Sequence, residues 1–115
     1  MGGGSLRLET SNTVCNNVSA VGVINLNEWQ HVAVSVTRGA AGNLTKLYVN
    51  GVEVASGNIP ADDLTNPNLQ IGAVSAGGQF FDGSIDEVRI WDHARTPAEI
   101  VDNMNRCFAG GETGL

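Results

Sequence analysis

Four acidic side chains between residues 80 and 100 are the groups in this sequence best suited to chemistry: Asp82, Asp86, Glu87 and Asp92. Two carboxyl groups about 5 Å apart can act as acid and nucleophile in glycoside hydrolysis. Carboxylate oxygens are also the ligands that a hard cation such as Ca²⁺ requires. The spacing of these acids therefore helps to decide between catalysis, metal binding and a structural role.

The spacing argues against a glycosidase. Successive side chains of a strand point to opposite faces, so catalytic acids on one strand must occupy alternate positions. If residues 84–92 form a strand, Asp82 and Asp86 share a face, but Val88 and Ile90 make the rest of that face apolar. No glutamate lies at the offset that a catalytic pair needs. We therefore predict that the chain is not an enzyme, with a glycosidase-related hydrolase as a distant alternative.

Ordinary structural roles account for the same acids. We expect Asp86 to accept backbone N–H bonds at a strand end, with a metal or glycan ligand as the alternative. Glu87 and Arg89 lie two positions apart and are expected to form a solvated ion pair on one face. Asp92 is expected to tie the strand to the following helix through Arg95. These interpretations favour architecture over catalysis.

The histidine and aromatic residues lead to a similar interpretation. His31 is expected to be structural, because no Ser or Cys nucleophile pairs with it in a recognised motif. Trp29 and Trp91 are predicted to lie in the core, because both stand among apolar neighbours in expected strands. An exposed aromatic ring would provide a platform for sugar stacking. Tyr48, on the expected polar face of a hairpin, is the predicted candidate.

Composition limits the partners. The 115 residues suit one domain, and 6 Lys and Arg against 12 Asp and Glu give a net charge of -6. Nucleic acid is not expected as a partner, because phosphate binding needs a basic surface. No apolar run approaches the ~20 residues of a membrane span, so no membrane insertion is expected. Cys15 and Cys107 could be free thiols or a single disulfide, and they are too few for a zinc site.

The pattern of short apolar runs is typical of an all-β protein. Runs rich in Val, Ile, Leu and Thr alternate with clusters of Gly, Asn, Asp and Pro. The predicted strands are 5–9, 18–26, 29–37, the two halves of a hairpin within 44–57, 69–72 and 84–92. In 29–37, Val32, Val34 and Val36 share one face. Such strands with one helix predict an all-β sandwich.

The clearest local signal is the Asn-Gly pair at 50–51. This pair favours a type I′ turn, whose two central residues need positive φ. A two-residue turn there sets the strand register and predicts Val49 opposite Val52 and Leu47 opposite Val54, all on one face.

One helix is expected near the C-terminus. Thr96 to Glu99 reads Thr-Pro-Ala-Glu, a capping box with Pro at the first helical position. The helix is predicted to run from there to about Arg106. We assign residues 1–108 to the sandwich domain and 109–115 to a C-terminal tail.

Four motifs in series resemble the laminin-G-like and pentraxin-like branch of the concanavalin A-type jelly rolls: WQHVAVSV, KLYVNGVEVASG, NLQIG and FFDGSIDEVRIWDHARTPAEI. The resemblance covers roughly Trp29 to Val101. It implies an antiparallel jelly-roll-like β-sandwich. It also implies a non-catalytic module that binds a glycan or a protein outside the cell. Domains of this family usually carry more strands before this point, so the chain is expected to be shortened at its N-terminal side.

Two departures from the pentraxins concern their functional residues. After the short strand that ends in Gly, pentraxins carry Gln-Glu-Gln-Asp, which binds calcium, whereas residues 73–76 here read Ala-Val-Ser-Ala. No cofactor is therefore expected, and calcium remains an alternative only away from the pentraxin-type site. The pentraxin signature His-x-Cys-x-Ser-Trp is kept only at His31 and Ser35. The closer resemblance is to bacterial laminin-G-like modules.

A ligand site is predicted on the loops 59–68 and 73–83, together with the expected exposed tyrosine. Its candidate residues are Asp62, Asp63, Asn66, Gln79, Asp82 and Tyr48. The alternative function is assembly: a shortened sandwich would leave a strand edge open, and a second copy would cover it. We therefore expect a homodimer whose interface uses the N-terminal strands.

Overall fold

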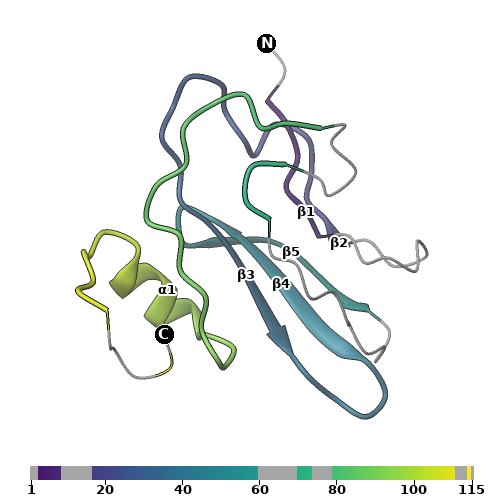
Figure 1. The fold of residues 1–115 in the computed structure, drawn as a ribbon. Helices are drawn as coiled ribbons and strands as arrows, with labels where there is room; N and C mark the ends of the chain where they lie inside the picture. The colour runs from purple at the N-terminus through teal and green to yellow at the C-terminus, as the bar shows by residue number, and fades with distance from the viewer. Residues whose placement is uncertain (1–2, 9–16, 60–69, 74–78, 111–113, 115) are drawn as a thin grey trace.

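The computed structural model describes residues 3–8, 17–59, 70–73, 79–110 and 114. Within these residues it contains five strands and one helix (Figure 1). The elements, in chain order, are β1 (Arg7–Leu8), β2 (Asn17–Val18), β3 (Val32–Thr37), β4 (Asn43–Val49), β5 (Val52–Ile59) and α1 (Pro97–Asn103). No helix in this part of the chain is long and apolar enough to cross a membrane.

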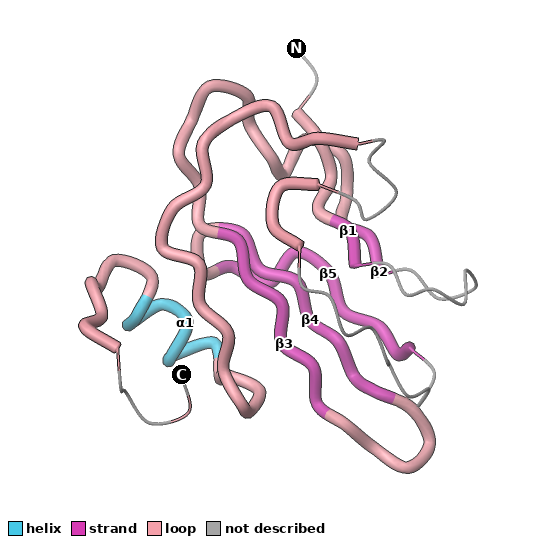
Figure 2. The backbone as a smooth tube through the Cα atoms, in the orientation of Figure 1, coloured by secondary structure: helices cyan, strands magenta, loops and turns pink. Residues whose placement is uncertain are grey.

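The strands form two antiparallel sheets (Figure 2). β1 pairs with β2, and β3, β4 and β5 form a three-stranded sheet with β4 in its centre. β2 also lies close to β4 and β5, so the small sheet is in contact with the larger one. This arrangement, with its single short helix, confirms the predicted all-β class.

The central strand β4 carries most of the core. Leu47, Tyr48 and Val49 are buried in succession, and Thr45 is fully buried on the same strand. Successive side chains of a strand point to opposite faces, so three consecutive buried residues mean that both faces of β4 are covered. The hydroxyl of Thr45 donates to the carbonyl of Gly57 at 2.9 Å, which satisfies the polar group inside the sheet.

The hairpin between β4 and β5 confirms the predicted turn but corrects part of its register. The residues at 50–51 have φ values of 50° and 79°, as a type I′ turn requires, and Val49 pairs with Val52. An irregularity between Leu47 and Tyr48 shifts the pairing beyond that point, so Leu47 lies opposite Ala55 and not opposite Val54. A bulge inserts an extra residue into one strand, which a count from the turn does not anticipate.

Strand β3 is shorter than predicted, and the valines that were predicted to share one face form its exposed side. It begins at Val32, and its valines at 32, 34 and 36 are exposed whereas Ser35 is buried. β3 has one partner strand, β4, so it is an outer strand of its sheet. The valine row therefore lies exposed on an outer strand of this sheet.

Two other predicted strands are corrected. Residues 84–92 form no strand; Glu87 adopts a positive φ of 53°, which breaks the two-residue period of an extended chain. The predicted strand 18–26 is reduced to β2 and an isolated bridge between Gly4 and Ile24, with turns between them. Of the predicted strand 69–72, residues 70–72 form none, and residue 69 lies outside the described residues.

Helix α1 confirms the predicted capping box. The side chain of Thr96 accepts the backbone N–H of Glu99, and the Glu99 carboxylate accepts the N–H of Thr96 at 2.8 Å. The helix ends at Asn103, one turn earlier than predicted. Beyond the helix end, the guanidinium of Arg89 donates to the carbonyls of Asn103 and Arg106, and the N–H of Arg106 donates to the carbonyl of Asn103 at 3.1 Å. Ile100 is the buried residue of the helix and marks its inner face.

The turn at Gly51 generates a stability prediction. A Cβ at Gly51 would lie 2.7 Å from Cγ2 of Val101 on α1, and the positive φ strains any β-branched residue. We expect Gly51→Val to lower the free energy of unfolding by about 2–3 kcal/mol, measured by denaturant titration. Gly110→Val is the matched control, because Gly110 has a φ of 87° and nothing within 4 Å of its Cβ position. Equal losses of unfolding free energy in both variants would contradict the contact between the turn and the helix.

Candidate ligand-binding site

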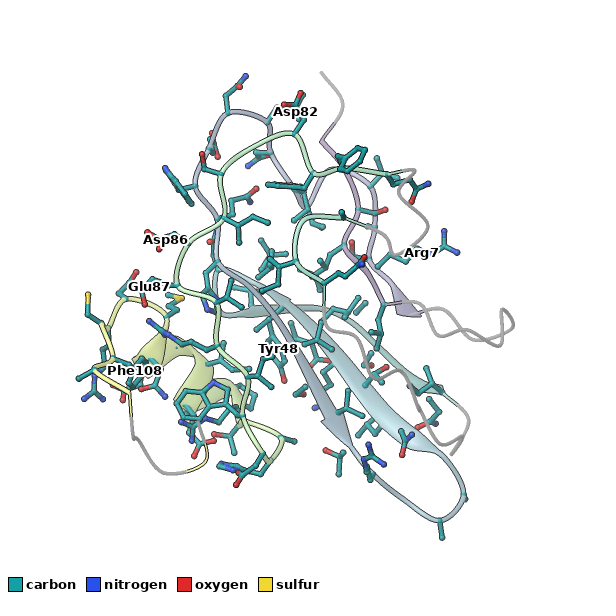
Figure 3. The ribbon with its side chains drawn as sticks, viewed as in Figure 1. Arg7, Tyr48, Asp82, Asp86, Glu87 and Phe108 are labelled. Carbon is teal, nitrogen blue, oxygen red and sulfur yellow. The ribbon has the colours of Figure 1, made fainter. Side chains whose placement is uncertain are left out.

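The predicted site residues Gln79 and Asp82 lie together on one exposed segment, residues 79–82. An isolated bridge between Ala73 and Phe80 holds this segment, and the N–H of Phe81 donates to the carbonyl of Gly72 at 2.8 Å. Figure 3 places Asp82 at the end of the molecule that carries the N-terminus in Figure 1. A ligand would therefore meet an amide and a carboxylate on a loop with a fixed backbone.

Two adjacent aromatic residues on this segment were missed by the sequence-based prediction. Phe80 and Phe81 are 74% and 61% exposed. The ring of Phe81 also lies close to Gly83, where a Cβ would come within 2.9 Å of its Cε1. The Phe-Phe pair itself was the available signal, because neighbouring side chains of an extended segment cannot both face the same core. The other predicted loop residues, Asp62, Asp63 and Asn66, lie outside the described residues.

Tyr48 is not a site residue, which corrects its predicted exposure. Its side chain is 1% exposed on the central strand, and Figure 3 shows it in the middle of the molecule, away from Asp82. Its hydroxyl is buried with no hydrogen-bond partner among the described residues. The prediction assumed one wet face on the hairpin, but both faces of β4 are covered. A buried ring cannot stack on a sugar.

Trp29 differs from its prediction in the opposite direction to Tyr48. It was predicted to lie in the core but is 73% exposed, and it precedes β3 instead of belonging to it. The alternation pattern assigned it to a strand that begins three residues later. The exposed aromatic rings of this protein are thus Trp29, Phe80 and Phe81 in the part of the chain that the structure describes.

Trp91 lies in a cluster with the C-terminal segment and is only partly exposed. The guanidinium of Arg95 lies 3.5 Å from the centre of its ring, and Phe108 meets it edge to face at 5.6 Å. The predicted tie between Asp92 and Arg95 is replaced by other pairs. Asp92 contacts His93 at 2.7 Å, and Arg95 contacts Glu99 at 3.5 Å.

Arg89 has a structural role as well. Its predicted pair with Glu87 is confirmed at 3.0 Å, but the Arg89 side chain is only 10% exposed, so the pair is less solvated than expected. Its guanidinium also lies 4.2 Å from the centre of the Phe108 ring. The carboxylate of Asp86 accepts the N–H of Glu87 at 2.8 Å, which confirms the backbone role predicted for it although no strand ends there.

A shallow hollow of about 440 Å³ lies beside these residues. Its lining residues are Ile71, Glu87, Val88, Arg89, Ile90, Phe108, Ala109 and Gly110. The charges of Arg89 and Glu87 are paired with each other, and Arg89 also donates to two backbone carbonyls. The charged groups of the hollow therefore already serve the fold.

His31 occupies the junction between β3 and the hairpin turn. Its N–H donates to Oδ1 of Asn50 at 2.9 Å, and its carbonyl accepts the N–H of Asn50 at 2.7 Å. Partial burial lowers the pKa of His31, and the positive charge of Arg89 lowers it further. Its Nδ1 is buried without a hydrogen-bond partner among the described residues. This environment suits the structural histidine that the sequence predicted, and the lowered pKa favours its neutral form.

The described residues contain no group of three or more His, Cys, Asp or Glu side chains placed to hold a metal ion. Cys107 is free and exposed, and Cys15 lies outside the described residues. The geometry that remains is a short, exposed polar and aromatic segment, residues 79–82, at one end of a small β-protein.

The family model that matches is described as the concanavalin A-like lectin/glucanases superfamily, and it covers residues 1–101. The chain therefore belongs to this superfamily. The match reaches further towards the N-terminus than the resemblance expected from Trp29 to Val101. No solved structure matches the chain significantly.

One curated relative is similar in sequence: mouse (Mus musculus) pappalysin-1, 34% identical over 82 residues. The alignment covers 67% of this chain but only 5% of the length of pappalysin-1. The similarity therefore concerns one short region of a much longer protein. It supports the domain class and says nothing of the activity of the whole relative.

The position of His31 generates a pH prediction. Its pKa is lowered in the folded state, so the unfolded state binds the proton more readily than the folded one. The contribution of His31 to the free energy of unfolding is therefore fully present above the unfolded pKa of ~6.5. It is lost as the pH drops through the folded pKa. Denaturant titrations between pH 8 and 5 should show this loss. His31→Gln should remove this pH-dependent loss of stability, and His93→Gln should keep it. An identical dependence of the unfolding free energy on pH in both variants would contradict the assignment of the loss to His31.

Proposed function

We propose that the chain is a non-catalytic binding module that recognises a glycan or a protein ligand through residues 79–82. The observation that carries the proposal is the exposure of Phe80 and Phe81 next to Gln79 and Asp82 on a loop that hydrogen bonds hold in place. Aromatic rings flanked by an amide and a carboxylate can stack on a sugar ring and bind its hydroxyl groups. Membership of a superfamily that includes lectins supports the same class.

The placement of the acids supports a role without catalysis. Figure 3 shows Asp82 and Asp86 well apart on the chain that runs past β3. A retaining glycosidase needs its two carboxyl groups about 5 Å from each other. Asp86 is already hydrogen-bonded to the N–H of Glu87. We therefore assign Asp82 to ligand contact and Asp86 to the backbone.

Binding to an array of immobilised glycans tests the site. We expect Phe80→Ala and Phe81→Ala each to weaken binding on the order of tenfold, because each removes a stacking surface. Asp82→Asn should alter glycan preference. Val52→Ala is the matched control, since Val52 is 64% exposed on the hairpin beside α1. Undiminished glycan binding by both phenylalanine variants would refute this site, and an array without signal would leave a protein as the ligand.

The same experiment is repeated with calcium and with a chelator. The sequence at 73–76 lacks the acids of the pentraxin loop, so binding and melting temperature should be unchanged by millimolar calcium or by a chelator. A melting shift of several degrees that the chelator abolishes would reveal a calcium site elsewhere in the chain.

Assembly is the second candidate function. The observation that favours it is the exposed valine row of the outer strand β3, at positions 32, 34 and 36. Exposed outer strands with apolar side chains tend to pair with another chain. A homodimer was expected from the sequence through the N-terminal strands, and the valine row adds an apolar surface for it. Light scattering at tens of micromolar tests this candidate; a monomeric mass would refute it.

A further inference from the structure

Asp82 differs from the other acidic side chains of this protein in having no partner of its own. The structure describes eight of the 12 acidic residues. Seven of these eight contact a described residue through a hydrogen bond or an ion pair: Glu28, Glu53, Asp86, Glu87, Asp92, Glu99 and Asp102. The exposed carboxylate of Asp82 makes no such contact within the described residues. Its charge is therefore available to a ligand.

Phe80 and Asp82 lie on one side of their segment. Phe80 is bridged to Ala73 as a strand residue is, and successive side chains of an extended chain point to opposite sides. The position of Phe81 agrees with this alternation, because its Cε1 lies 2.9 Å from the Cβ position of Gly83, two residues further along. The ring of Phe80, which is 74% exposed, therefore stands on the same side as the free carboxylate.

Gln79 and Phe81 form the other side of the segment. Both are exposed. The amide can donate and accept hydrogen bonds, and the ring offers an apolar surface, so this side suits an uncharged sugar unit. The segment thus presents a ring with a carboxylate on one side and a ring with an amide on the other.

The basic residues that the structure describes do not neutralise Asp82. Four of them are paired with other acids: Lys46 with Glu53, Arg89 with Glu87, Arg95 with Glu99 and Arg106 with Asp102. Figure 3 shows Arg7 well apart from Asp82. Arg38 follows β3, on the turn that Figure 1 places at the opposite end of the molecule. Together with the net charge of -6, this placement favours a cationic ligand group over an anionic one.

We propose that the side formed by Phe80 and Asp82 recognises the ammonium group of an amino sugar, so that the ligand is a glycan with free amines. A cation is attracted both to the face of an aromatic ring and to a carboxylate. An N-acetylated unit brings no charge to Asp82, and an acidic unit is repelled by it. The inference rests on the proposed glycan function of residues 79–82 and adds to it the class of sugar.

The second side of the segment favours a glycan over a lysine-bearing protein. A lysine side chain offers an ammonium group and an apolar stem but no hydroxyl groups. It would use Phe80 and Asp82 and leave the amide of Gln79 without a match. Consecutive units of a sugar chain carry hydroxyl groups and apolar C–H faces along their whole length, so they can meet both sides of one segment.

Calorimetric titration with a short glucosamine oligomer tests the inference. The comparison ligand is an N-acetylglucosamine oligomer of the same length, at about pH 6, where the sugar amine holds its proton. We expect the unaltered protein to bind the glucosamine oligomer on the order of tenfold more tightly. Asp82→Asn should make the two affinities nearly equal. Asp102→Asn is the matched control: it removes the same charge from a side chain that is 72% exposed on α1, and it should keep the preference.

Two further variants distinguish the two sides. Phe80→Leu should lower the affinity for the glucosamine oligomer more than that for the acetylated one, because leucine keeps an apolar surface but has no aromatic face for a cation. Phe81→Leu should lower both affinities to the same extent. Added salt should reduce the preference of the unaltered protein.

Three results would overturn the inference. Equal affinities of the unaltered protein for the two oligomers would remove the amino sugar and leave the proposed glycan function standing. A preference that survives in Asp82→Asn, or that Asp102→Asn also abolishes, would assign it to the net charge of the protein.

The third result is that neither oligomer binds while a lysine-rich peptide does and loses affinity in Asp82→Asn, which would make a protein the ligand. Melting temperatures equal to that of the unaltered protein establish that the variants are folded. If Phe80→Leu is unfolded, Asp82→Asn and its control decide the outcome alone.

Discussion

The buried guanidinium of Arg89 joins the irregular C-terminal segment to the rest of the fold. It donates to the carbonyls of Asn103 and Arg106, pairs with Glu87 and lies over the ring of Phe108. These carbonyls end α1, which has no basic residue in its own last turn. A cation from another part of the chain therefore satisfies the negative end of the helix. Its bonds to two carbonyls need the forked geometry of an arginine.

Arg89 holds the C-terminal end of α1, and α1 in turn packs against the hairpin turn. Val101 packs against Gly51, so the helix leaves no room for a side chain at the turn between the two most extensively paired strands. The positive charge of Arg89 also acts on His31 at the start of β3 and helps to keep it neutral. One side chain thus links a helix end, a turn and a strand that are distant in the sequence.

The features that the sequence predicted correctly are local. The Asn50-Gly51 turn, the capping box of Thr96 and the Glu87–Arg89 pair each depend on residues no more than three positions apart. The errors concern properties that depend on distant segments. Tyr48 is buried because β4 became a central strand covered on both faces, and no pattern within the hairpin contains that information. The positive φ of Glu87 likewise interrupts a strand that alternation predicted.

The candidate site was harder to predict than the fold for a related physical reason. Alternation tells which side chains share a face, but it does not tell which face meets water. In the loop 21–29 and the segment 79–82, hydrogen bonds from the backbone and from Gln30 are made within the protein, so apolar side chains are left to face outward. The sequence pattern predicted Trp29 as a core residue because it stands among apolar neighbours in an expected strand. The exposure of Trp29, Phe80 and Phe81 is a property of the folded chain, which alternation within one segment does not contain.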